Sequence, residues 1–330
     1  MDKKLSRTIM IMLGLIFVSF TISAQDLNDA KREIKKGDQK KRSNEYVEAI
    51  ESYSNCVSII NGLGVDVDEE AVEILEAAEK KWVKSHLDYA NDLFDQNKYD
   101  QALDHYNKVI ELGNKYSQDD YVDKANKNIP KVWYAKGKAS LQAKNYEEAI
   151  KNFDEAIKGD PDYGWAYIRK AMAYRDMEQP EKMEKSIDEA IKVGEKTDNK
   201  NVVNAATQVG YRFYYNHGAT ALKNKDYSTA AKQLQKAVKY NGSATTHHYL
   251  ALSYGEIGEY EKAIENESKA IDMMEEEKSQ EEMAKYYYTL AGYYKETGES
   301  SKACTAYKNA AYGQYKANAE YQIKHILKCN

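Results

Sequence analysis

The chain has 330 residues, of which 31% are charged and 42% are hydrophobic, with 48 basic against 53 acidic side chains. This length is enough for two ordinary domains or for one long repeat array. The net negative charge argues against generic binding to nucleic acid or to an anionic membrane surface. With only 3 Pro and 17 Gly, and no sustained alternation of apolar and polar residues, the sequence predicts an all-α fold.

The first 24 residues have the pattern of a secretory signal peptide. Three basic residues lie within the first seven positions, residues 9–20 form an apolar run of 12, and small residues follow at Ser23 and Ala24. We therefore expect residues 1–24 to be removed on export. Their loss changes the net charge from −5 to −7, because three basic residues and one acidic residue are removed. A spanning helix needs about 20 apolar residues, so no transmembrane segment is expected in the mature chain. The alternative is an uncleaved anchor.

Residues 130–163 form a 34-residue unit in which small and bulky residues occupy fixed places. Gly137 and Ala149 are small, as expected where two antiparallel helices touch closely. The bulky side chain of Phe153 fills the space beside them. Pro161 lies just past the second helix, where its missing N–H stops further helix growth. This spacing predicts a helix–turn–helix unit.

At these positions the unit resembles a tetratricopeptide repeat (TPR), and similar units precede and follow it. A single TPR cannot bury its own apolar face, so neighbouring repeats are required. The resemblance implies a right-handed α-solenoid of about seven TPR helix pairs, ended by a capping helix. The predicted repeats lie near residues 30–63, 83–116, 130–163, 164–197, 211–243, 244–277 and 284–313, and the cap covers residues 314–330.

The repeats are unevenly spaced, because extra residues precede several of the first helices. These extra residues also follow helical spacing, which predicts first helices several turns longer than the minimal repeat. Suitable helix starts are Asp66 and Asp68, Asp119 and Asp120, and Asp198 and Asn199. Pro130 falls inside one extended helix, where we expect a kink or a break. The extra segments are residues 66–82, 117–129, 197–210 and 275–283.

The last segment, residues 314–328, is predicted to form one helix that covers the open end of the array. Such a cap is needed because the terminal repeat of a solenoid otherwise exposes its apolar side. The apolar residues at helical spacing in this segment are Ala317, Tyr321, Ile323 and Ile326.

The chain has three cysteines, and export implies an oxidising compartment. Cys56 stands at a small-residue position of the first repeat, which favours a buried thiol and leaves open whether it stays free. Cys304 lies in the last repeat and Cys329 at the chain end, on helices expected to pack side by side, so we predict a disulfide between them. A cysteine pair in this place also resembles exported TPR proteins of Bacteroidetes. That resemblance implies a periplasmic or cell-envelope location.

Motifs for catalysis or metal binding are not found in the sequence. It contains no Gly-rich phosphate loop and no nucleophile elbow. His247 and His248 are adjacent and splay around a helix, whereas a zinc site on a helix needs a spacing of three or four. His86 and His247 occupy aromatic packing positions, which predicts structural roles. We therefore expect a protein that is not an enzyme and that uses no cofactor or metal.

In TPR proteins, defined positions of the first helices line a concave face, and the resemblance implies that these positions bind the ligand. In the central repeats they hold basic and aromatic side chains, which suit an acidic peptide or a carboxylate terminus. For Trp165, a place in the core between repeats is the alternative. The family's carboxylate clamp is not reproduced, because Ile34 and Asp38 stand where the clamp has Lys and Asn. The predicted ligand-binding residues are Lys131, Tyr134, Lys138, Trp165, Arg169, Met172, Arg175, Arg212, Tyr215 and Asn216.

The sequence therefore predicts an exported, non-enzymatic scaffold that binds another protein or peptide and holds an assembly together. No nucleic acid partner is expected. One alternative is an accessory subunit that binds cell-envelope polysaccharide or peptidoglycan, with sugars stacked on the tyrosine-rich face. A third alternative is a hydrolase, which would need a convergent acid–base or nucleophile pair in a pocket.

Overall fold

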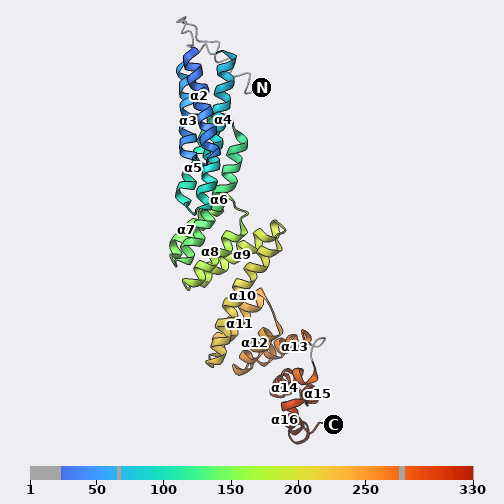
Figure 1. Ribbon diagram of the computed structural model, residues 1–330. Helices are drawn as coiled ribbons and strands as arrows, with labels where there is room; N and C mark the ends of the chain where they lie inside the picture. The colour runs from blue at the N-terminus through green and yellow to red at the C-terminus, as the bar shows by residue number, and fades with distance from the viewer. Residues whose placement is uncertain (1–23, 65–67, 275–278, 330) are drawn as a thin grey trace, which may run out of the picture. The chain divides into compact units, whose positions relative to one another are not determined.

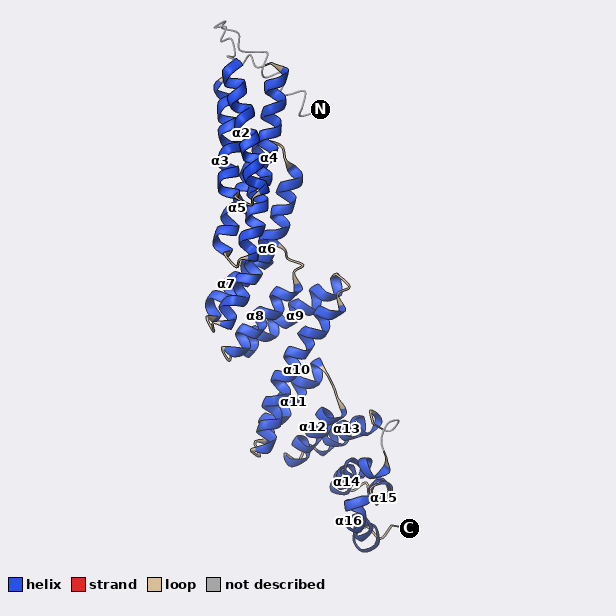
Figure 2. Cartoon of the chain, viewed as in Figure 1, coloured by secondary structure: helices blue, strands red, loops and turns tan. Residues whose placement is uncertain are grey.

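The computed structural model describes residues 24–64, 68–274 and 279–329. These residues fold into helices joined by short turns, and no strand occurs among them (Figures 1 and 2). The predicted signal peptide lies outside the described residues except for Ala24, and so does the start of the last predicted extension, residues 275–278. No helix in the described ranges is long and apolar enough to cross a membrane.

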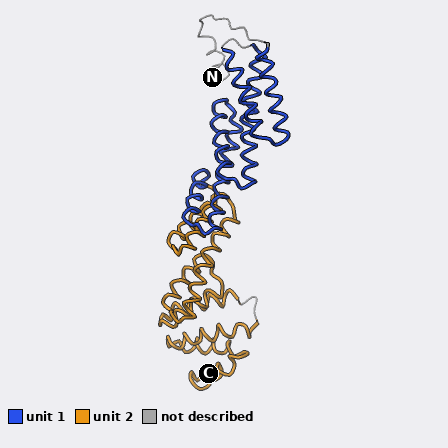
Figure 3. Tube along the Cα trace, turned by 60° about the vertical axis from the view of Figure 1, so that its left-hand side comes forward, with its two compact units in different colours: residues 1–161 blue, residues 162–330 orange. Residues whose placement is uncertain are grey.

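Two compact units divide the chain, residues 1–161 and residues 162–330 (Figure 3). The helices of the first unit are α2 (Ala24–Arg42), α3 (Tyr46–Gly62), α4 (Glu69–Asp95), α5 (Tyr99–Lys115), α6 (Asp119–Gln142) and α7 (Tyr146–Gly159). The α-helices of the second unit are α8 (Gly164–Asp176), α9 (Pro180–Lys196), α10 (Lys200–Lys223), α11 (Tyr227–Tyr240), α12 (Ala244–Glu256), α13 (Tyr260–Asp272), α14 (Gln280–Glu296), α15 (Ser300–Asn309) and α16 (Lys316–Tyr321).

Consecutive helices pack as pairs, from α2 with α3 to α14 with α15, and each pair falls on one predicted repeat. Within each unit, the first helix of a pair also contacts a neighbouring first helix: α4 contacts α2 and α6, while α10 contacts α8 and α12. These contacts build a layered array of helix pairs. The predicted all-α solenoid is therefore confirmed.

The turn inside each helix pair has the same backbone geometry. The residue at position 15 of every repeat is left-handed, with φ between 56° and 79°. The next amide donates to a carbonyl five residues earlier, as Asn145 N–H does to the Ser140 oxygen at 2.9 Å. This hydrogen bond closes the end of the first helix and sends the second helix back alongside it. The seven left-handed residues are Asn44, Asn97, Lys144, Glu178, Lys225, Gly258 and Gly298.

Within a pair, a small residue of the first helix faces a bulky residue of the second. A Cβ atom at Gly137 would lie 2.6 Å from Cε1 of Phe153, which is fully buried. A Cβ atom at Gly218 would lie equally close, 2.6 Å from Cγ of Leu234. Because neither bulky side chain has room to move in a packed core, the two backbones can approach only where glycine stands.

The extended first helices begin near the predicted residues. Asp68 precedes α4 and accepts a hydrogen bond from the Ala71 amide at 2.8 Å. Asn199 caps α10 in the same way, through the Val202 amide at 3.3 Å. Asp119 lies in the first turn of α6, where its negative charge faces the positive end of the helix.

Pro130 does not break α6, so of the predicted kink or break, the break is wrong. The helix runs from Asp119 to Gln142 through the proline. Pro130 is buried, and a Cβ atom at Gly159 would lie 2.9 Å from its Cγ atom. The ring removes one helix hydrogen bond, but its packing against α7 holds the segment in place.

The C-terminal segment is less regular than predicted. It starts as a 3-10 turn at Gly313–Tyr315, continues as α16, and ends as a π-helix at Gln322–Ile326. A change of helix type rotates the following side chains away from a single 3.6-residue face. Tyr321 and Ile326 are therefore 55% and 50% exposed, and Ala319 is the residue of α16 that is buried.

The disulfide lies in the second unit, and the free thiol lies in the first. Cys304 on α15 is bonded to Cys329, with Cα atoms 5.8 Å apart, so the bond joins the last repeat to the end of the cap. Cys56 on α3 is free and fully buried, and burial raises its pKa to about 11. Its thiol is therefore protonated and unreactive at neutral pH.

Candidate binding surfaces

The first helices of the second unit carry seven of the predicted ligand-binding residues. These helices contact one another in the order α8, α10, α12, so their side chains share one surface, which we call the first-helix face. Six of the seven are half-buried or exposed polar and aromatic groups, and the seventh is a half-buried methionine. They are Trp165, Arg169, Met172 and Arg175 on α8, with Arg212, Tyr215 and Asn216 on α10.

On α8 the two predicted arginines have different surroundings. One terminal nitrogen of the Arg169 guanidinium lies 3.5 Å from the Met172 sulfur. The Arg175 Nε atom donates to the Asp176 carboxylate at 2.7 Å, so that much of its charge is neutralised locally. Trp165 is half-buried and packs against the core that contains Ile168. Its role is therefore partly in the core, and the remaining exposed part of its ring is available at the surface.

Three tyrosines continue this surface from α10 to α12 as a stacked row. The rings of Tyr211 and Tyr215 lie 5.4 Å apart, and those of Tyr215 and Tyr249 lie 6.1 Å apart with planes only 12° from parallel. The Tyr211 hydroxyl shares a hydrogen bond with Thr246 Oγ1 at 3.1 Å, which fixes the end of the row. Burial raises the pKa of Tyr215, so its phenol stays neutral. We call Tyr211, Tyr215 and Tyr249 the tyrosine row.

Sequence reasoning missed two of the three members of the tyrosine row. Tyr249 stands at the sixth position of its repeat, the position that Arg169 and Asn216 occupy in theirs. Applying the same position rule to the sixth repeat would have identified it.

The other three predicted residues, Lys131, Tyr134 and Lys138, lie on α6 in the first unit. The Lys138 ammonium is 5.7 Å from the centre of the Tyr134 ring, and that ring lies 6.0 Å from Phe153. Lys131 is exposed and donates to Asn128 at 3.0 Å. The ten predicted residues therefore fall into two groups, one in each unit.

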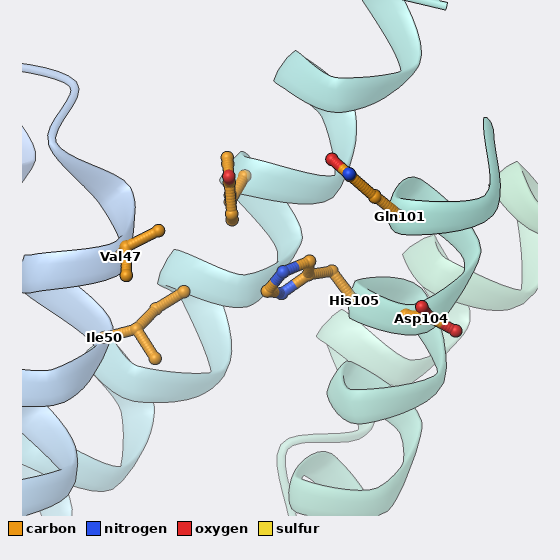
Figure 4. Close-up of a pocket in the computed structure, with 6 residues that line it drawn as sticks. Val47, Ile50, Gln101, Asp104 and His105 are labelled. Atoms are coloured by element: carbon orange, nitrogen blue, oxygen red, sulfur yellow. The ribbon is translucent and has the colours of Figure 1, made fainter. Parts of the chain in front are cut away.

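A cavity of about 340 Å³ lies on another side of the first unit, between α3, α4 and α5. His105 reaches into its centre, opposite the aliphatic side chains of Val47 and Ile50 (Figure 4). The lining residues are Val47, Ile50, Tyr89, Gln101, Asp104 and His105.

His105, which lines this first cavity, is paired with the buried His86. The Nδ1 atoms of His86 and His105 are 2.8 Å apart, so one ring donates to the other. Burial, followed by the neighbouring His105, lowers the pKa of His86 to about 4, and burial also lowers the pKa of His105. Both rings are therefore neutral at pH 7, which suits an apolar guest better than a charged one. Among the described residues, no group of three His, Cys, Asp or Glu side chains is placed to hold a metal ion.

A second cavity of about 340 Å³ has the same place in the second unit, between α9, α10 and α11. His217 corresponds in repeat position to Tyr89 of the first cavity, and Gln233 corresponds to His105. Sequence reasoning missed both cavities because it considered only the face formed by the first helices. The lining residues are Glu178, Pro180, Glu181, Phe213, Tyr214, His217, Gln233 and Lys236.

Buried histidines in the sixth repeat make structural hydrogen bonds. His247 Nδ1 lies 2.9 Å from Asn266 Oδ1, and His248 Nδ1 lies 2.9 Å from the carboxylate of Glu267. His247, His248 and Glu267 are all buried. These residues join α12 to α13 and present no group to solvent.

Three segments of the chain match the sequence profiles of the tetratricopeptide repeat: residues 87–164, 166–195 and 211–243. A small glutamine-rich tetratricopeptide repeat-containing protein of Dictyostelium discoideum is 26% identical over 135 residues, covering 37% of this chain and 36% of the relative. The chain thus spans about a third of that relative's length.

Solved structures of similar helical proteins include MamA, at 19% identity and a TM-score of 0.31, over 60% of this chain and 96% of MamA. Another is a tetratricopeptide repeat protein of Parabacteroides merdae, at 14% identity and a TM-score of 0.29, over 92% of this chain and all of that one. The repeat assignment itself rests on the matched segments and on the packed helix pairs. Residues 87–164, 166–195 and 211–243 therefore carry sequence matches to tetratricopeptide repeats, and the other described helix pairs share their turn geometry.

Proposed function

We propose that this protein is a non-enzymatic scaffold that binds another protein or peptide through the first-helix face. The observation that carries the proposal is the tyrosine row on α10 and α12, together with Arg212 on α10 and Arg169 on the contacting helix α8. Half-buried, pre-stacked rings offer large contact area at little cost in side-chain entropy, as binding surfaces require. Guanidinium groups next to them favour carboxylates, so the preferred partner segment is acidic.

We further propose that the scaffold acts outside the cytoplasm, in the periplasm or cell envelope, where it holds a protein complex together. The signal-peptide pattern of residues 1–24 supports export, and the bonded pair Cys304–Cys329 is consistent with an oxidising compartment. N-terminal sequencing of the exported protein should begin at Gln25. A retained Met1 in an envelope fraction would reject the cleavage.

A second candidate function is binding of cell-envelope polysaccharide or peptidoglycan. The near-parallel rings of Tyr215 and Tyr249 favour it, because flat aromatic faces stack on the apolar faces of sugar rings. Co-sedimentation with purified peptidoglycan separates the two functions. Sedimentation that depends on Tyr215 and Tyr249 would favour the polymer, whereas a soluble chain would favour the protein partner.

The protein partner can be captured by crosslinking in envelope fractions and then titrated against charge-reversal variants. Arg169→Glu with Arg212→Glu should weaken binding at least tenfold, or about 1.4 kcal/mol. A matched control reverses the exposed Lys192 and Lys232, which lie on second helices. Helix content should not change in either variant, because exposed charges contribute little to folding. Equal losses in both variants, or no loss in the first, would contradict binding at the first-helix face.

A further inference from the structure

The second cavity contains two carboxylates that have no cation of their own. Glu178 and Glu181 both line it and are exposed, and neither forms an ion pair within the described part of the chain. Glu178 is the left-handed turn residue, with φ 56°, and Pro180 begins α9 immediately after it. The turn is fixed by the hydrogen bond from the Gln179 amide to the Tyr174 carbonyl at 2.9 Å. Backbone geometry therefore fixes the positions from which the two glutamate side chains extend.

His217 adds a further hydrogen-bond acceptor to the cavity. Its Nδ1 atom lies 2.8 Å from the backbone oxygen of Phe213. A carbonyl oxygen can only accept, so in the neutral ring Nδ1 carries the proton and Nε2 keeps its lone pair. Nε2 is on the far side of the ring from the helix backbone. The cavity thus offers acceptors from Glu178, Glu181 and His217 to one guest.

Aromatic faces form the wall beside these acceptors. The rings of Phe213 and His217 lie 4.2 Å apart, and Tyr214 meets Phe213 edge-on at 5.0 Å. Tyr214 is only 1% exposed, so its ring belongs to the packed part of this wall. Burial and then the nearby Glu184 raise the pKa of Tyr214, so its hydroxyl stays neutral. A cation entering the cavity would find an aromatic wall beside the acceptors.

One cation of the chain itself, the ammonium group of Lys236, already lies at this cavity. The Lys236 ammonium lies 3.1 Å from Glu184 and 4.9 Å from the centre of the Tyr214 ring. A carboxylate on one side and an aromatic face on the other therefore hold a positive charge at this end. Glu178, Glu181 and Phe213 line the same cavity and are the same kinds of group, and neither carboxylate forms an ion pair within the described part of the chain.

We infer that this second cavity binds an arginine side chain of a partner protein. A guanidinium has five N–H donors and no acceptor, which matches a site made of acceptors. Its flat, weakly hydrated face also stacks on an aromatic ring, which the compact ammonium of lysine does less well. This site lies apart from the first-helix face and prefers the opposite charge. The inference therefore does not depend on the proposed function of that face.

The test titrates the full mature chain with N-acetyl-arginine methylamide and follows the imidazole signals of the protein by NMR. The His217 signals should shift and saturate. The citrulline analogue, which keeps the shape but lacks the charge, should bind at least tenfold more weakly, and the lysine analogue should bind less tightly than arginine. Equal binding of arginine and citrulline would overturn the inference.

Variants then separate this site from general attraction between charges. Glu178→Gln with Glu181→Gln should lower the affinity for the arginine probe at least tenfold. The matched control is Glu147→Gln with Glu148→Gln, which neutralises two exposed carboxylates at the start of α7 and should change nothing. Phe213→Leu keeps an apolar side chain but removes the ring, and it should also weaken arginine while leaving helix content intact. If the control loses as much affinity as Glu178→Gln with Glu181→Gln, the arginine site is rejected.

Discussion

The two units use the same helix-pair turn but organise their cores differently. In the first unit, one hydrophobic cluster runs from Leu27 on α2 to Val132 on α6. In the second unit, the described buried residues divide into four smaller clusters. The lesson is that equal repeat geometry does not give equal continuity of the core.

The first helices differ in length between and within the units. In the first unit α4 and α6 have 27 and 24 residues, while in the second unit α10 also has 24 but α8 and α12 have 13 each. The extra turns of α4 bury Ala71 and Ala78 completely, so they add contacts between repeats. Both the tyrosine row and the proposed arginine site are found in the second unit, whose core is divided, as expected when binding surfaces use regions of lower local stability.

The largest expected effect comes from opening a cavity in each core. Leu93→Ala in the first unit and Leu234→Ala in the second should each lower the free energy of unfolding by about 3 to 5 kcal/mol. Both leucines are almost fully buried. Hydrogen exchange should show loss of protection throughout α2 to α6 for Leu93→Ala, but loss centred on α10 to α12 for Leu234→Ala. If both variants lose protection over the same helices, the continuous core of the first unit does not make its unfolding more cooperative than that of the second unit.

The disulfide is the next largest contribution, and it acts only in the second unit. Cys304 and Cys329 are 25 residues apart. Closing a loop of this size should stabilise the last repeat and its cap by about 3 kcal/mol. Cys304→Ser with Cys329→Ser should therefore lower the melting temperature of the oxidised protein. A reducing agent should lower it in the wild type and not in the variant. Equal melting of the oxidised wild type and the variant would contradict this role.

Acid should weaken the first unit through His86. Its pKa falls from 6.5 to about 4 on folding, mainly through burial. The unfolded chain therefore binds more protons between these values, and stability decreases as the pH falls. The expected loss is about 2 kcal/mol between pH 8 and pH 5.

The second unit should respond to Glu267 in the opposite direction. Burial raises the pKa of this carboxyl above 4.5, so its contribution to stability is greatest at low pH and is lost as the pH rises through the folded value.

The variant His86→Gln tests the acid sensitivity of the first unit. It should flatten the pH dependence of the stability of that unit only, as measured by hydrogen exchange. His325→Gln, at an exposed cap residue, is the control. An unchanged slope in His86→Gln would assign the acid sensitivity to another group.

The smallest effect tests the turn that the two units share. Lys144 and Lys225 have φ values of 62° and 63°, a conformation that disfavours side chains with a Cβ atom. Lys144→Gly and Lys225→Gly should each stabilise the protein by about 0.5 to 1 kcal/mol. The corresponding alanine variants serve as controls and should show little gain. A loss of stability in both glycine variants would mean that the lysine side chains matter more than the turn.

Much of the fold could be predicted because the residues that determine each helix pair lie within a single repeat. Gly137 opposite Phe153 and the caps Asp68 and Asn199 depend on neighbours in the sequence or on a fixed period. The course of α6 through Pro130 could not be predicted, since it depends on packing against Gly159. The irregular cap was missed for a similar reason. Helical spacing alone does not show where the backbone changes from an α-helix to a π-helix.

The candidate sites were less predictable than the fold. The position rule located Tyr215 and the arginines, but stacking with Tyr249 requires knowledge of how α10 and α12 approach each other. The tautomer of His217 and the unpaired charges of Glu178 and Glu181 depend on three helices and a turn. No single sequence position indicates that these groups meet in the folded protein, so the site could not be predicted from the sequence.

The most direct test of the account is hydroxyl-radical footprinting of the mature chain with and without its captured partner. The method reads the exposure of Trp, Met and Tyr side chains. Partner binding at the first-helix face should lower the oxidation of Trp165, Met172 and Tyr215, while Tyr89 in the first cavity keeps its reactivity. Unchanged oxidation of Trp165, Met172 and Tyr215, with protection confined to other residues, would contradict binding at the first-helix face.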